Sequence, residues 1–348
     1  MRKKPFQSRS SLVTFGSILL MIALFSGCLL YTSTAYATTQ RTHASHALGS
    51  GVQGVQVFVE PAAGEQPILD AINNAQTSVY VEMYLLTDTN VINALENAAQ
   101  NGLDVRVMLE QHPYGGGSPA GTLQALSNAG AQTAYSNPAF TYTHEKGMII
   151  DGTTAYIMSC NFTRSALGGS SSTKNREYGI IDTNSADVQT ALGVFNADWN
   201  RSSYTLTDDN IVLSPVNSRS DFTDLINSAQ NSLEIEAEEM ADSSIEQAIV
   251  NAEARGVKVQ VILPNSNSNS AGISTLDSGG VSVSKDTQYY MHAKMMIVDG
   301  TMAFVGSENI STNSLDNNRE MGLLISDSSV ISTLQNAFQN DLNNSQAA

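Results

Sequence analysis

One pattern of polar residues occurs twice in this chain of 348 residues, with its spacing unchanged. The two copies are His144, Lys146 and Asp151, and then His292, Lys294 and Asp299. A Ser-x-Asn triplet follows each copy, and all five residues of the second set lie 148 positions after their counterparts. A register kept over that distance predicts two halves of domain size rather than a solenoid of short units.

Other segments repeat as well. Asn175-Arg176-Glu177 follows the first copy and Asn318-Arg319-Glu320 the second, at a spacing of 143 because the first half has a longer Gly/Ser loop at 168–173. Before the motifs, residues 67–86 match residues 220–240, with Asp70 and Asp224 separated by 154 positions. The repeat therefore covers most of the chain.

The order of the expected elements indicates the fold class. Residues 67–86 and 220–240 each read as a helix, a polar turn and an alternating strand, and a second helix in each half ends at Gly102 or Gly256. This alternation predicts an α/β protein of two tandem halves, with mixed, largely parallel sheets flanked by helices and related by a pseudo-twofold axis. The predicted halves span 53–205 and 206–345.

The motif residues are expected at strand ends. Residues 146–152 and 294–300 are short apolar runs that end in Asp-Gly, and a second apolar run follows each at hairpin distance. Because side chains alternate along a strand, each His and Lys should share one face. The second run should deliver the Ser and Asn to the same place, so that eight polar residues meet in one cleft.

The N-terminal segment has a different character. Arg2, Lys3 and Lys4 precede an apolar run, and Ala35-Tyr36-Ala37 matches an export cleavage site, so residues 1–37 are predicted to be a signal peptide. The sequence before Cys28 is similar to the lipobox of bacterial lipoproteins, which leaves lipidation, or an uncleaved anchor, as alternatives. Each alternative places the body outside the cytoplasm, secreted or membrane-anchored. Residues 38–52 read as a linker.

Charge and cysteine content narrow the function. The net charge is −16, and the export segment holds four basic residues and no acid, so the body carries −20. A surface of this charge disfavours nucleic acid and anionic membranes as partners. Cys160 is the one cysteine of the body, which excludes an intramolecular disulfide there.

Two copies of His-x-Lys-x4-Asp with their companions resemble the phospholipase D superfamily, the HKD phosphodiesterases, over about residues 53–340. The resemblance implies a monomer with an internal pseudo-dimer, in which one histidine attacks phosphorus and the other protonates the leaving oxygen. By similarity to the family, His144 is the expected nucleophile and His292 the acid. The motif residues, including Asp151 and Asp299, form the predicted catalytic set together with Glu177 and Glu320.

Physical roles can be assigned within this set. Lys146, Lys294, Asn161 and Asn309, with Ser159 and Ser307, are expected to bind the phosphate, so neither metal nor cofactor is predicted. Glu177 and Glu320 are the expected partners of histidine Nδ1. The alternative gives that role to Asp151 and Asp299, for which we favour contacts to the backbone. The acidic groups Asp208-Asp209 and Glu234, Glu236, Glu238 and Glu239 are expected to be solvated surface.

The substrate is less constrained than the reaction. The leading interpretation is an exported phospholipase D that hydrolyses a phospholipid head group to give phosphatidic acid, meeting the membrane transiently or through a lipid anchor. Alternatives are a nuclease, a transphosphatidylase of the cardiolipin synthase type, and an inactive scaffold, which the intact paired motifs disfavour.

Overall fold

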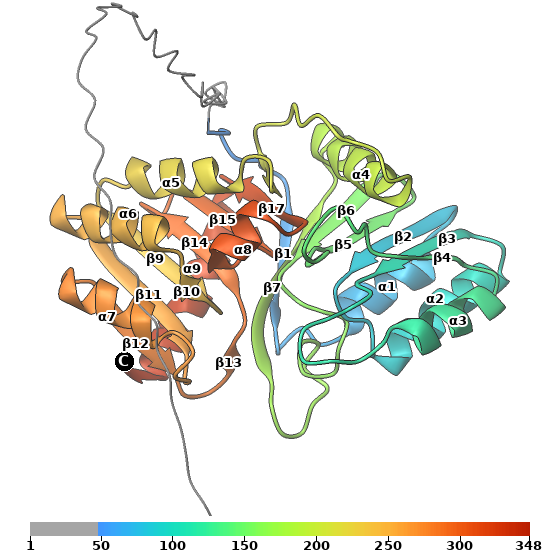
Figure 1. Cartoon of the computed structure of the whole chain (residues 1–348), viewed down its shortest axis with the longest axis horizontal. Coiled ribbons are helices and arrows are strands. Elements are labelled where there is room, and N and C mark those ends of the chain that lie inside the picture. Colours follow the sequence, from blue (N-terminus) through green and yellow to red (C-terminus); the bar gives the residue numbers. More distant parts are fainter. Residues whose placement is uncertain (1–47) are drawn as a thin grey trace, which may run out of the picture. The chain divides into compact units, whose positions relative to one another are not determined.

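The computed structural model describes residues 48–348, and these contain two eight-stranded sheets (Figure 1). The predicted signal peptide and the linker up to residue 47 lie outside the described residues. The order of the first sheet is β1-β7-β6-β5-β2-β3-β4, with β13 paired to β7. The second sheet has the order β18-β12-β11-β9-β14-β15-β17-β8, and β10 and β16 form a separate pair.

The first half contains these elements: β1 (Gln56–Glu60), α1 (Gln66–Asn74), β2 (Ser78–Met83), α2 (Thr89–Gln100), β3 (Asp104–Leu109), α3 (Ala120–Asn128), β4 (Gln132–Tyr135), β5 (Lys146–Ile150), β6 (Thr154–Met158), β7 (Asn175–Asp182) and α4 (Ser185–Trp199). The second half contains these: β8 (Ile211–Ser214), α5 (Ser218–Ser228), β9 (Ser232–Ala237), β10 (Met240–Ala241), α6 (Ser243–Ala254), β11 (Lys258–Pro264), α7 (Ser270–Ser278), β12 (Ser282–Asp286), β13 (Tyr290–Met291), β14 (Lys294–Val298), β15 (Met302–Gly306), β16 (Ile310–Ser311), α8 (Thr312–Asp316), β17 (Glu320–Ile325), α9 (Ser328–Asn343) and β18 (Ser345–Ala347).

The α/β class and the mixed character of the sheets agree with the prediction, but the sheets are less parallel than expected. Parallel pairing joins β2, β3 and β4, and likewise β9, β11 and β12. The strands that carry the motifs pair antiparallel, β5 with β2 and β6, and β14 with β9 and β15. The tight hairpins that begin with Asp-Gly account for the pairs β5–β6 and β14–β15, because a loop of three residues can only join antiparallel strands.

Equivalent local signals start equivalent helices in the two halves. Asp88 caps α2 by accepting hydrogen bonds from two backbone amides, and Asp242 caps α6 in the same way. Both aspartates are buried, and 154 positions separate them, as they separate other repeated residues before the motifs. Repeated capping of this kind starts α2 and α6 at equivalent positions in the two halves.

The apolar core has three parts. One cluster packs α1, α2 and α3 on the first sheet, and a second packs α5, α6 and α7 on the second sheet. The third draws on both halves, with Tyr178 and Ile180 of β7, Met295 and Ile297 of β14, and residues of α4 and α9. The two halves therefore share one core. Within residues 48–348, no helix is long and apolar enough to cross a membrane.

Candidate active site

The backbone brings each motif histidine to the opposite half of the chain. His144 lies just before β5, and its amide donates to the carbonyl of Arg319, 2.9 Å away. His292 lies just before β14, and its amide donates to the carbonyl of Arg176 at 3.3 Å. Because Arg319 and Arg176 directly precede Glu320 and Glu177, each histidine is held beside the glutamate of the other half.

The side chains complete this crosswise arrangement. Nδ1 of His144 lies 2.8 Å from Glu320, and Nδ1 of His292 lies 2.7 Å from Glu177. A carboxylate can only accept, so each Nδ1 carries the proton and Nε2 is the atom available for chemistry. Both glutamates are completely buried. The pairing of the motif glutamates with histidine Nδ1 agrees with the expectation from the sequence.

Buried polar groups hold the two glutamates in place. Glu177 accepts from Ser159 Oγ at 2.7 Å and from Asn175 at 3.0 Å. Glu320 accepts from Ser314 Oγ at 2.7 Å and from Asn318 at 3.0 Å. Burial works to raise the pKa of Glu320, but the charges of His144 and Lys146 outweigh it and lower that pKa.

The placement of the two serines corrects a prediction. Ser159 and Ser307 were expected to bind phosphate, but both are fully buried. The Ser159 hydroxyl is used by Glu177 and by the amide of Tyr178, and Ser307 Oγ accepts from the amide of Met321. The expectation that strand alternation would bring each Ser and Asn to one place therefore fails for the serines, whose hydroxyls face the neighbouring strand and support β7 and β17.

The two lysines lie behind the histidines and are almost completely buried. Lys146 Nζ donates to the His144 carbonyl at 2.5 Å and sits 5.4 Å from the centre of the Tyr84 ring. Burial lowers the pKa of Lys146 to about 8. Burial also lowers the pKa of His144, and Lys146 adds to this effect while Glu320 opposes it. Buried cations at this position would neutralise a bound phosphate.

A cavity of about 400 Å³ joins the two sets of residues. His144 and Asn161 line it from the first half, and His292 and Asn309 from the second. The Oδ1 atom of Asn309 is buried without a hydrogen-bond partner among the described residues. Both histidines and both amides thus border one space, as the repeated motif predicted.

Asp151 and Asp299 are not part of this cavity, which corrects their inclusion in the catalytic set. They follow the far ends of β5 and β14, about five residues or ~16 Å of extended chain beyond the lysines. Asp151 accepts hydrogen bonds from three successive backbone amides beginning at Gln76, and Asp299 from three beginning at Gln230. The expectation that they bind backbone agrees with the structure.

Glu238 lies in the site, although we expected it to be solvated. Its Oε2 lies 2.7 Å from Lys294 Nζ and 3.2 Å from Nε2 of His292, and its Oε1 accepts from the Tyr290 hydroxyl at 3.3 Å. Burial by itself would raise the pKa of Glu238, but the charges of His292 and Lys294 hold that pKa well below its usual range. Glu236, also expected at the surface, is fully buried and accepts from the Tyr178 hydroxyl at 2.6 Å.

A break in the repeat is the sequence signal that marks Glu238. At 154 positions before it, the first half has Tyr84. The Tyr84 ring packs edge-on against His144, with centroids 4.6 Å apart. The two halves of the cavity are therefore chemically different, an aromatic ring beside one histidine and a carboxylate beside the other.

Two further observations concern residues outside the cavity. Cys160 is buried. Arg176 forms an ion pair with Asp341 of α9, and Arg319 pairs with Asp198 of α4 at 2.6 Å. Because each pair joins residues of different halves, both arginines link the two halves.

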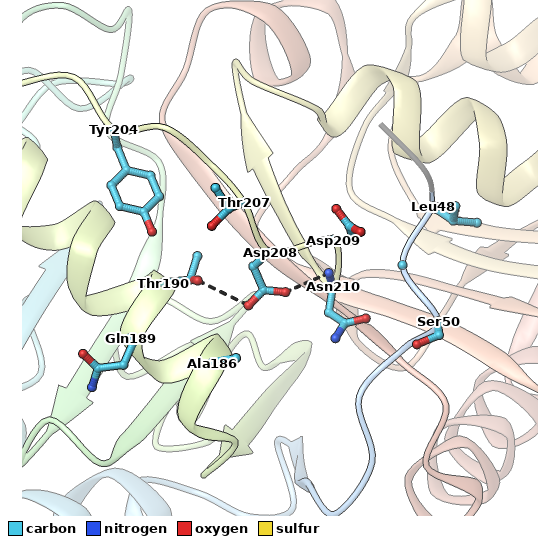
Figure 2. Close-up of a pocket in the computed structure, with 11 residues that line it drawn as sticks. Leu48, Ser50, Ala186, Gln189, Thr190, Tyr204, Thr207, Asp208, Asp209 and Asn210 are labelled. Atoms are coloured by element: carbon cyan, nitrogen blue, oxygen red, sulfur yellow. Dashed lines mark hydrogen bonds between the residues drawn. The ribbon is translucent and has the colours of Figure 1, made fainter. Parts of the chain in front are cut away.

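A larger hollow, about 740 Å³, lies between residues 48–50, α4 and residues 204–210 (Figure 2). None of its lining residues belongs to the repeated motifs. Its half-buried Asp208 already accepts from Thr190 Oγ1 at 3.2 Å and from the Asn210 amide at 3.0 Å. By volume alone this hollow would be the stronger candidate for an active site. The repeated histidines and asparagines, however, line the smaller cavity.

Comparison with known proteins identifies the class. The family described as "Cardiolipin synthase, PLD-like domain" matches the chain twice, over residues 68–199 and 222–342. The chain therefore belongs to this family of the phospholipase D superfamily, with one family domain in each half. A cardiolipin synthase of Oceanobacillus iheyensis is 26% identical over 338 residues, covering 84% of this chain and 69% of that protein.

Two solved structures share the fold. The chain is similar to a polyphosphate kinase from Porphyromonas gingivalis, with a TM-score of 0.68 at 14% identity, over 83% of this chain and 47% of the other. It is also similar to a phosphatidylserine synthase from Haemophilus influenzae Rd KW20, with a TM-score of 0.66 at 15% identity, over 86% and 88% of the two chains. At these identities the likeness is one of fold alone.

Proposed function

We propose that this protein transfers the phosphatidyl group of a glycerophospholipid to an alcohol through a phosphohistidine. The observation that carries the proposal is the pair of His–Glu contacts, formed crosswise between the halves and open to one cavity. Phosphodiester cleavage needs a nucleophile and an acid on opposite sides of phosphorus, and the cavity supplies both. The relatives named cardiolipin synthase support an alcohol acceptor.

The proposed first step uses both histidines. His144 Nε2 attacks phosphorus, the bond from phosphorus to the head-group oxygen breaks, and His292 gives its Nε2 proton to that oxygen. Glu320 stabilises the charge that develops on His144, because its carboxylate accepts a hydrogen bond from the Nδ1–H group. Lys146, Lys294, Asn161 and Asn309 would neutralise or bind the non-bridging oxygens.

In the second step, neutral His292 removes a proton from the incoming alcohol. The alcohol oxygen forms a new bond to phosphorus as the bond to His144 breaks, which restores both histidines. Uncharged groups also line the cavity, among them Tyr142, Ser311 and Asn313, and these groups can bind hydroxyls of a polyol acceptor.

Hydrolysis is the second candidate, and it is the reaction that we expected from the sequence. It differs only in the acceptor, since water in place of the alcohol would release phosphatidic acid. The same residues serve both reactions, so the acceptor distinguishes them. For location, the N-terminal segment supports a proposal that the body is exported and meets phospholipid outside the cytoplasm.

Labelled lipid products test the proposal directly. The full chain is incubated with vesicles of phosphatidylglycerol, or of phosphatidylcholine with added glycerol, and products are separated by mass. We expect a second phosphatidyl group on phosphatidylglycerol, giving cardiolipin, or exchange of choline for glycerol. Phosphatidic acid alone would support hydrolysis instead.

Histidine variants, EDTA treatment and a nucleic-acid substrate serve as controls for this experiment. His144→Ala and His292→Ala should each lower turnover by about 10³-fold or more, because the site has one nucleophile and one acid. The activity should survive EDTA, since lysines and amides are proposed to bind the phosphate. Cleavage of single-stranded DNA without any turnover of phospholipid would overturn the proposed substrate class.

A further inference from the structure

The two motif histidines have different environments in a sequence that is otherwise nearly symmetric. His144 has one carboxylate, Glu320, at Nδ1, and the Tyr84 ring packs against it. His292 has a carboxylate at each nitrogen, Glu177 at 2.7 Å from Nδ1 and Glu238 at 3.2 Å from Nε2. The second carboxylate is the main chemical difference between the two sides of the cavity.

The contacts of Glu238 indicate that it is ionised. Its Oε2 is 2.7 Å from the Lys294 ammonium, and its Oε1 accepts from a tyrosine hydroxyl. A negative charge 3.2 Å from Nε2 favours the form of His292 that carries a proton on that nitrogen. Nδ1 of His292 must also carry a proton, because it lies 2.7 Å from the carboxylate of Glu177. Lys294 Nζ lies 3.2 Å from that same Nδ1, but a protonated nitrogen cannot accept from it.

From this geometry we infer that Glu238 is a positioning residue that holds the proton on Nε2 of His292 in the free protein and so makes His292 the acid. His144 has no such carboxylate at Nε2 and is left as the nucleophile. The inference rests on the proposed function and adds to it the residue that assigns the two roles. When substrate binds, the leaving oxygen takes the place of Glu238 at Nε2 and receives the proton.

Several charged or titratable groups act on His292, and the test must separate them from Glu238. Glu177 approaches from β7, Lys294 from β14, and the Tyr290 ring from β13, with its centroid 6.2 Å from the imidazole centroid. His144 and Lys146 act on the same carboxylates from the first half. Glu239 also borders the cavity, but its side chain bonds to Ser311. Glu239→Gln is therefore a matched control for Glu238→Gln.

Leaving groups that differ in their need for a proton provide the kinetic test. A phosphatidyl diester of p-nitrophenol needs no acid, whereas a diester of an alkyl alcohol does. At pH 7.5, Glu238→Gln should lower kcat/KM for the alkyl diester about 10- to 100-fold and for the nitrophenyl diester less than about threefold. The alkaline limb of its pH–kcat/KM profile should move to lower pH, because that profile reports the free enzyme. Glu238→Asp should restore part of the loss, and Glu239→Gln should change kcat/KM for the two diesters by the same factor and leave the pH profile in place.

Equal losses on both diesters, or an unchanged pH profile, would overturn the inference and leave Glu238 as a phosphate-site residue. A faster Glu238→Gln variant would overturn it as well, because it would mean that the carboxylate only obstructs the phosphate. Nitrogen NMR of the ring gives a readout independent of turnover. In the unmodified free protein at pH 7, His292 should have protons on both nitrogens and His144 on one; in Glu238→Gln, His292 should lose its Nε2 proton. If the unmodified protein turned over no phospholipid, the proposed function would fail, while the NMR result would still decide the role of Glu238.

Discussion

At the scale of single residues, Asp151 and Asp299 show how a conspicuous motif residue can act through structure. Both adopt left-handed backbone conformations, with φ of 55° and 52°. Burial by itself would raise the pKa of each carboxylate, but hydrogen bonds from backbone amides outweigh burial and lower that pKa. Each aspartate therefore ties the end of its motif strand to the turn after the first helix of its half.

A substitution separates this role from catalysis. Asp151→Ala removes the acceptor for three amides and should reduce the free energy of unfolding by about 1–3 kcal/mol. In the protein that remains folded, kcat should stay within about threefold of the parent, because the carboxylate lies away from the cavity. Urea denaturation and steady-state kinetics on the same preparation measure both. A large loss of kcat with unchanged stability would return Asp151 to the catalytic set, and Asp299→Ala is the matched comparison.

At the scale of elements, β7 and β17 each use adjacent residues for two different purposes. Arg176 and Glu177 point to opposite faces of β7, as neighbours in a strand must. Glu177 meets a histidine of the other half, while the Arg176 guanidinium pairs with Asp341 of α9 and donates to the Glu60 carbonyl. The same division holds at the start of β17, where Arg319, the residue just before the strand, pairs with Asp198 and donates to the Ser214 carbonyl at 2.7 Å.

These arginine pairs should contribute more to stability than ordinary surface ion pairs. Asp341→Ala leaves a buried guanidinium without its partner, which should cost about 3–5 kcal/mol. The exposed Asp224 of α5 supplies a control, since Asp224→Ala should change stability by less than about 0.5 kcal/mol. Guanidinium denaturation compares the two variants. Equal effects would show that the pair between β7 and α9 contributes little.

At the scale of the whole molecule, the shared interior contains acids that the proposed chemistry does not use. Glu145 and Glu82 are buried in the first half, and neither oxygen of Glu82 has a hydrogen-bond partner among residues 48–348. Burial raises the pKa of Glu145 to about 8 and the pKa of Glu82 well above its usual value. The residue equivalent to Glu145 in the second half is Ala293. The acid is therefore not required by the fold.

A stability profile against pH follows from these shifts. A carboxyl with a raised pKa in the folded state favours folding fully below its ordinary pKa of 4.5 and loses that contribution as the pH rises to about 8. The free energy of unfolding should therefore fall between pH 5.5 and 8, by about 1 kcal/mol per pH unit for Glu145. Glu145→Ala should flatten this slope in urea titrations. An unchanged slope in the variant would mean that Glu145 ionises normally.

The sequence by itself determined the repeat, the α/β class, the hairpins that carry the motifs and the kind of chemistry. It could do so because these depend on local periodicity and on residue types that recur in register. His144, Lys146 and Asn161, with their counterparts, border or back the cavity as their strand positions predicted. The pairing of a histidine with a motif glutamate could also be predicted from the sequence, because a carboxylate is a suitable acceptor for the hydrogen bond from Nδ1–H.

Only the tertiary structure decided which glutamate serves which histidine. His144 and Glu320 are 176 positions apart, and the two halves are so alike in sequence that pairing within a half or across halves looks equivalent. Packing of β7 and β17 against the opposite half selects the crosswise arrangement. The same packing moves Ser159 and Ser307 out of the cavity and brings Glu238 into it. These outcomes depend on contacts between distant segments, and local patterns do not encode the geometry of those contacts.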